Sequence, residues 1–225
     1  MSDGQRIYLL ESGSFPSGVV PFCGFIRGGA REALHDAVNE WVPGRNDLER
    51  VFSLVTPEAR FWSHLPNVAH TELPITDIHW PIMSTRLLDT LRRAGRLSER
   101  LVSVVFDQHP LWSDSFEPSY RDVHERVALP LASNQDHVGL VVPRTQCLDI
   151  GRSRGIHYAV NPLTGEQLQK IRYVEEITFL TPPGGFPPIF QIAELPVGDL
   201  YVNETAKGIV ESEGVRVRLT PFDVG

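Results

Sequence analysis

The period at which apolar residues recur changes along the chain, and this separates expected strands from expected helices. Apolar positions at helical spacing predict a helix over 30–42, ended by Pro43-Gly44. Thr56-Pro57 predicts the capped start of a second, short helix. Runs rich in aliphatic, β-branched and aromatic residues predict strands over 7–10, 19–25, 101–106, 138–142, 147–150, 156–160, 171–180, 189–192 and 215–219.

Turn residues between these runs indicate how the strands connect. Residues 7–10 end at Glu11-Ser12-Gly13, which predicts an edge strand. The runs between 138 and 180 are separated by Pro143, by a glycine-bounded segment at 151–155 and by a turn at 161–165, which predicts an antiparallel meander. The fold class expected is α+β, with a mainly antiparallel sheet and a few flanking helices, in a single domain over 1–225.

The chain contains an internal repeat. Residues 81–95 read PIMSTRLLDTLRRAG and residues 200–214 read LYVNETAKGIVESEG. In each copy an apolar strand leads to a capping residue, Ser84 or Asn203, and a helix follows. Gly95 and Gly214 then occupy the position after the helix where a left-handed backbone is usual, and a strand comes next. We therefore expect a repeated unit of strand, capped helix, glycine and strand.

The order of these pieces carries a resemblance to a known family. The apolar strand, the Asn203-Glu-Thr-Ala-Lys207 helix start, Gly214 and the closing Thr220-Pro-Phe222, with the earlier Pro81-Ile-Met-Ser84, resemble the immunity proteins of bacterial polymorphic toxin systems. The specific group is the one numbered eleven among them, which overlaps a former domain of unknown function. The likeness covers residues 75–225, leaves 1–74 as an N-terminal lobe outside it, and treats 107–135 as an insertion. It implies a small cytoplasmic protein that inactivates a toxin encoded beside it by direct non-covalent contact.

Composition limits the class of protein and of partner. The 225 residues are 41% hydrophobic and 22% charged, which is typical of a globular chain and not of a disordered one. No apolar run approaches the roughly 20 residues that span a bilayer, and residues 1–10 do not resemble a secretory signal. Two distant cysteines favour a reducing, cytoplasmic compartment. The net charge of −7 disfavours nucleic acid as a partner. A solvated acidic surface is the simpler explanation of this charge, and the capture of a basic protein is the alternative.

The search for catalytic or metal-binding motifs predicts neither a catalytic residue, a metal site nor a cofactor. His64, His70 and His79 have no metal-ligand spacing. Gly151-Arg-Ser-Arg-Gly155 resembles a phosphate nest, but a hairpin turn between strands explains it more simply. Asp107 and His109 form the one pair suited to general base chemistry, which leaves a small hydrolase or transferase as the alternative function.

Aromatic residues with acidic neighbours mark the expected partner-binding segment. Interfaces favour aromatic anchors flanked by charges that select the partner. The expected contact residues are Trp112, Asp114, Phe116, Glu117, Tyr120 and Asp122. The same rings would equally serve to pack the insertion onto the core. Phe186, in the proline-rich loop 181–188, is a second candidate contact. The function expected is an immunity protein that neutralises a cognate, basic toxin such as a nuclease.

Overall fold

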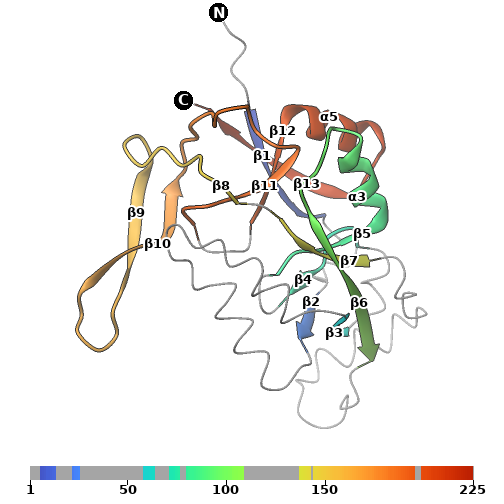
Figure 1. Cartoon of the computed structure of the whole chain (residues 1–225), viewed down its shortest axis with the longest axis horizontal. Coiled ribbons are helices and arrows are strands. Elements are labelled where there is room, and N and C mark those ends of the chain that lie inside the picture. The colour runs from blue at the N-terminus through green and yellow to red at the C-terminus, as the bar shows by residue number, and fades with distance from the viewer. Residues whose placement is uncertain are drawn as a thin grey trace, which may run out of the picture.

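A computed structural model describes residues 6–13, 22–25, 58–63, 71–76, 80–108, 137–142, 144–195 and 199–224. The described strands form three sheets, and helices α3 and α5 lie side by side at one end of the molecule (Figure 1). Seven of the ten strand pairings are antiparallel. The predicted α+β class with a mainly antiparallel sheet is therefore confirmed. The predicted helix over 30–42 lies outside the described residues.

The first sheet has five strands. In spatial order they are β13 (Val217–Asp223), β1 (Arg6–Ser12), β12 (Leu200–Asn203), β11 (Ile189–Ile192) and β8 (Arg144–Thr145). The edge position predicted for 7–10 is wrong, because β1 pairs with β12 on one side and with β13 on the other. The burial of Ile7, Tyr8 and Leu10 explains this, since successive side chains of β1 point to opposite faces and both faces are covered.

The second sheet has six strands. In spatial order they are β4 (Ile75–Thr76), β2 (Phe22–Phe25), β3 (Glu58–Ser63), β6 (Arg100–Gln108), β7 (His137–Val141) and β5 (Ile82–Ser84). The short helix predicted after Thr56-Pro57 is wrong, because 58–63 form β3. This strand pairs in parallel with β6 and antiparallel with β2. Pairing on both sides outweighs a local capping preference worth about 1 kcal/mol.

Helices α3 (Thr85–Arg92) and α5 (Glu204–Ser212) begin at the predicted caps. The Ser84 hydroxyl accepts from the Leu87 N–H at 3.0 Å, and the Asn203 side chain accepts from the Ala206 N–H at 2.9 Å. Gly214 follows α5 with φ +61°, as predicted. Gly95 also has a positive φ, +150°, but it lies one residue further from its helix than Gly214 does.

Two clusters of buried side chains lie on opposite faces of the five-stranded sheet. Alternation along β1 and β12 divides them, since Tyr8 and Val202 belong to one cluster and Ile7 and Tyr201 to the other. The first cluster takes in α3 and α5 through Leu87, Leu91 and Val210. The second holds a group of aromatic rings: Phe179, Phe186, Phe190 and Tyr201.

The third sheet is a two-stranded hairpin of β9 (Arg154–Val160) and β10 (Gln167–Glu176). Of the strands in the predicted meander over 138–180, β9 and β10 pair with each other. Strand β7 instead pairs with β5 and β6 in the second sheet. Residues 147–150 contribute an isolated bridge from Leu148 to Phe179 rather than a strand. The hairpin turn predicted at 151–155 is consequently wrong, and the tight turn lies at 161–166.

Candidate functional site

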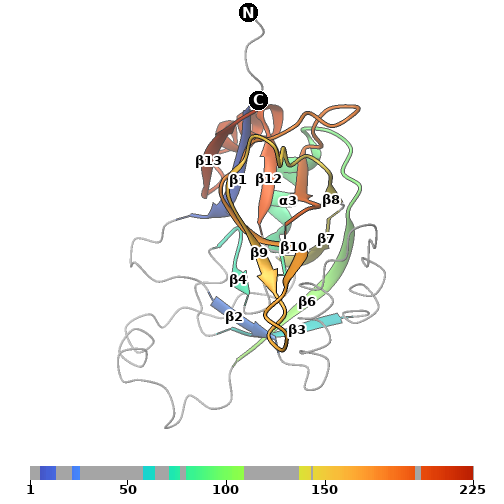
Figure 2. The ribbon, with the colours of Figure 1, turned by 90° about the vertical axis from the view of Figure 1, so that its left-hand side faces the viewer.

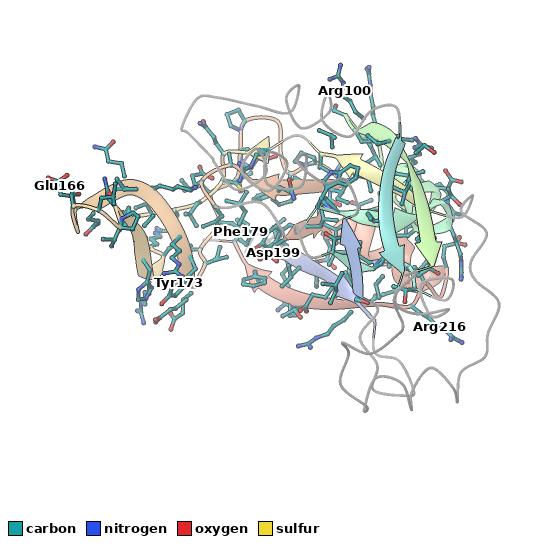
Figure 3. All side chains as sticks on the ribbon, turned by 90° about the horizontal axis from the view of Figure 1, so that it is seen from below. Arg100, Glu166, Tyr173, Phe179, Asp199 and Arg216 are labelled. Atoms are coloured by element: carbon teal, nitrogen blue, oxygen red, sulfur yellow. The ribbon has the colours of Figure 1, made fainter. Side chains whose placement is uncertain are left out.

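The hairpin of β9 and β10 projects from the body of the molecule in Figure 1, and it points toward the viewer in Figure 2. We call residues 154–176 the arm. Figure 3 shows Glu166 at its far end, and Phe179 where the chain returns to the body. Because the arm is a separate two-stranded sheet, both outer strand edges lack ladder partners within the described chain. Such edges and the exposed faces beside them are places where another protein can dock.

Exposed apolar side chains concentrate on the arm and beside its base. Six of the eight large hydrophobic residues exposed within the described part of the chain lie between 150 and 180. They are Ile150, Val160, Leu163, Leu168, Tyr173 and Leu180. Scattered exposed leucines are normal on protein surfaces, but a local concentration marks an interaction surface.

Leu163 is the most exposed of these side chains, at 93%, and the turn that carries it is well ordered by hydrogen bonds. The Asn161 side chain accepts from the backbone N–H groups of Leu163 and Thr164 at 2.9 and 3.4 Å. The backbone of Asn161 also pairs with Gly165 and Glu166 at 2.8 Å each, and Gly165 supplies the required positive φ of +73°. The turn therefore presents Leu163 in a fixed position, which lowers the entropic cost of binding.

One face of the arm carries a polar and aromatic cluster. His157 and Tyr173 are cross-strand partners whose rings stack at 4.1 Å with an interplanar angle of 15°. Glu175 Oε1 lies 3.0 Å from His157 Nε2. The stacked pair covers the strands locally while leaving Tyr173 47% exposed (Figure 3). Cross-strand contacts of this kind stiffen a two-stranded sheet.

The base of the arm is anchored in the aromatic cluster. Ile171 is buried there, and Ile156, Tyr158 and Val174 pack against the same group. The central ring, Phe179, makes edge-to-face contacts with its neighbours, including Phe186 at 6.0 Å. Phe186 is 6% exposed, so its predicted role as a surface contact is wrong. Its position in a proline-rich loop suggested exposure, but the loop folds this ring into the core.

A cleft of about 410 Å³ is lined by residues of the arm on one side and by Ile150 and Glu194 of the body on the other. Its apolar walls are formed by Ile150, Tyr158, Leu168 and Ile171. Three polar residues also line it: Gln167 and Gln169 on β10, and Glu194, which lies just after β11. Mostly apolar walls with few polar groups are typical of binding clefts.

Glu194 is the charged residue of this cleft. Burial raises the pKa of its carboxyl above the ordinary value, although the N–H groups of Glu194, Cys147 and Leu148 and the Arg144 guanidinium oppose the shift. Burial likewise lowers the pKa of Arg144 to about 10, and it raises the pKa of the Cys147 thiol to about 12. Arg144 Nη2 donates to the carbonyl oxygens of Ile192 and Leu195. The carboxyl group of Glu194 is thus partly desolvated, and this residue lines the cleft together with the apolar side chains.

The residues predicted to contact a partner cannot be placed in this site. Trp112, Asp114, Phe116, Glu117, Tyr120 and Asp122 lie outside the described residues, as do His64, His70, His79 and His109. Asp107 belongs to β6, where its backbone pairs with that of Trp62. The arm was missed by sequence reasoning, although a signal was present: Leu163 is an apolar residue within a turn otherwise made of Asn, Pro, Thr and Gly.

Within the described ranges, no group of three His, Cys, Asp or Glu side chains is placed to hold a metal ion. Among the same residues no helix has the length and apolar character needed to cross a membrane. Compared with known proteins, the chain matches no family model and no curated protein.

Proposed function

We propose that the arm is a protein-docking surface and that this protein is an immunity protein, which binds and neutralises a cognate bacterial toxin in the cytoplasm. The observation that carries the docking proposal is the exposure of Leu163 on a hydrogen-bonded turn, within a concentration of exposed apolar residues. Covering such side chains is favourable by about 25 cal/mol per Å² of apolar surface removed from water. A preformed turn retains more of that gain as binding free energy.

Two features of the sequence support a toxin, and specifically a basic one, as the partner. The order of elements from Pro81 to Phe222 resembles immunity proteins of polymorphic toxin systems. The net charge of −7 favours a basic toxin, for example a nuclease, because complementary charge speeds encounter and selects the partner. Residues 107–135 remain a second proposed contact segment. The alternative, a hydrolase or transferase that uses Asp107 and His109, stays a prediction.

We further propose that the chain contains a duplicated unit, as the sequence repeat predicts. Strands β5 and β6 flank β7 and are antiparallel to it, with α3 connecting them along the chain. Strands β12 and β13 flank β1 in the same way, with α5 between them. The shared topology supports this proposal. In an experimentally determined structure, superposing the units should place Ser84 on Asn203; helices of opposite direction relative to their sheets would contradict it.

Co-purification with the toxin domain encoded beside this protein tests the proposed function. Calorimetry at about 0.05 and 0.5 M salt should show nanomolar binding that weakens as salt rises, because screening reduces charge attraction between exposed surfaces. The toxin's activity should be lost at equimolar protein. No binding to the neighbouring toxin domain would overturn the immunity proposal, and a substrate screen with an Asp107→Asn variant would then test the enzyme alternative.

A further inference from the structure

The cleft between the arm and the body contains an acceptor that the described chain does not satisfy. Glu194 Oε2 is buried and makes no hydrogen bond within the described part of the structure. A buried polar atom without a partner destabilises the folded protein, because it has lost its hydrogen bonds to water. A donor from outside the chain would remove this destabilisation, and it would have to reach Glu194 through the cleft that this residue lines.

The walls of the cleft limit which donor fits. The side chains of Ile150 and Leu168 are 50% and 42% exposed. A small polar donor would leave these apolar surfaces uncovered. A purely apolar group would cover them and leave Glu194 Oε2 unsatisfied in a drier environment. A cation on an aliphatic stem satisfies both requirements, because lysine and arginine cover apolar surface with their stems while the charged end makes hydrogen bonds.

The remaining side chains of the cleft suit the same ligand. The ring of Tyr158 offers an aromatic surface to a cation. Gln167 and Gln169 add amide oxygens that can accept from the same donor. The Arg144 guanidinium interacts electrostatically with Glu194, and its Nη2 donates to the backbone carbonyl oxygens of Ile192 and Leu195. Glu194 Oε2 nevertheless has no hydrogen-bond partner within the described residues.

We infer that this cleft receives a lysine or arginine side chain of the toxin, with the aliphatic stem between Ile150, Tyr158 and Leu168 and the charged end at Glu194. This inference rests on the proposed function and deepens it, since it assigns the chemistry of one anchoring residue of the partner. Leu163, at the tip of the arm, and the cleft would then belong to one interface. Anchors that fill pockets commonly carry much of the binding free energy of an interface.

The cleft can be tested on the full chain without any toxin. The probe is n-butylguanidinium, and the matched control is n-butylurea, which has the same stem and no charge. Titration followed by amide NMR shifts should show saturable binding of the guanidinium at Ile150, Leu168 and Glu194. Butylurea should bind at least about tenfold more weakly, because hydrogen bonds to charged groups are the stronger ones. Equal binding of both probes, or binding of neither, would overturn the inference.

A variant assigns the interaction to its residue. Glu194→Gln keeps the size of the side chain and should weaken n-butylguanidinium binding at least about tenfold, with little effect on n-butylurea. The comparison of two probes on the unaltered chain holds even if this variant fails to fold. Unchanged guanidinium binding to a folded Glu194→Gln variant would contradict the assignment to Glu194.

The toxin complex separates this inference from the proposed function. If the toxin binds and Glu194→Gln weakens that complex about tenfold, both stand. If the toxin binds equally to both proteins, the cleft inference is wrong and the proposed function survives. If the toxin does not bind while n-butylguanidinium does, the proposed function fails and the assignment of the cleft to a toxin side chain fails with it.

Discussion

Arg93 and Glu213 form an ion pair of 2.7 Å that joins the end of α3 to the end of α5, across 120 positions of sequence. Arg86 donates to the backbone carbonyl oxygen of Glu213 at 3.1 Å, so one arginine within α3 and one at its C-cap contact the C-cap residue of α5. Both partners of the pair are about half exposed. We therefore expect Glu213→Ala to lower the free energy of unfolding by less than about 1 kcal/mol, measured by urea denaturation. A loss above about 2 kcal/mol would mean that this contact is a main support of the helix pair.

The packing of α3 predicts a much larger effect in the core. Leu91 is fully buried in the cluster that joins both helices to the sheets. Leu91→Ala should cost about 2–5 kcal/mol, because the lost transfer free energy adds to that of the cavity left behind. Leu163→Ala is the matched control, since its side chain is 93% exposed and its loss should change stability by no more than about 0.5 kcal/mol. Similar losses in the two variants would contradict the described core.

Substitution of glycine by alanine should lower the stability of the protein at Gly139 and raise it at Gly208. A Cβ added at Gly139 of β7 would lie 2.2 Å from Cη2 of the buried Trp80 ring. Gly139→Ala should therefore destabilise the protein by about 1–3 kcal/mol. Gly208 lies inside α5 with nothing within 4 Å of the added atom, so Gly208→Ala should stabilise by about 0.5–1 kcal/mol. Thermal or urea unfolding of both variants checks this, and the same sign for both would contradict it.

The burial of Cys147 predicts that its thiol reacts slowly in the folded protein. Its thiol is buried, and burial raises its pKa to about 12, so almost no thiolate is present at pH 8. Alkylation of the folded protein at pH 8 should be slower at Cys147 than in the urea-unfolded chain by roughly a thousandfold or more. Peptide mapping by mass spectrometry separates it from Cys23. Labelling at equal rates in the two states would contradict the burial of this residue.

The sequence predicts the local elements of this fold better than it predicts which strands are neighbours. Both described helices start at the predicted caps, because a capping side chain bonds to an N–H only three residues away. The partners of β1 and β7 depend on contacts between distant segments, such as Tyr8 with Pro221 and Met83 with Val138, which local periodicity does not encode. The helix predicted after Thr56-Pro57 is wrong for the same reason, because this segment forms a strand that pairs with the distant β6.

The candidate site was accessible from sequence only in part. The turn at 161–165 is predictable from Asn161 and Gly165, and a leucine within such a turn indicates exposure. The cleft is not predictable, because Glu194 reaches it from the end of β11 while Leu168 reaches it from β10, and no local pattern relates the two. The exposure expected for Phe186 is wrong because the proline-rich sequence around it indicates a loop but does not indicate that the ring is buried.

The most direct test of the account is the affinity of the toxin domain for Leu163→Asp compared with the unaltered protein, measured by calorimetry. The matched control is Leu101→Asp, which alters an exposed leucine of β6 outside the arm, with melting temperatures used to confirm that both variants fold. A charge placed on the apolar tip should weaken binding about 30-fold or more, because it removes an apolar anchor of the interface, while the control should change it less than about threefold. Unchanged affinity for Leu163→Asp would contradict the arm as the docking surface, and the segment 107–135 would then be the surface to test.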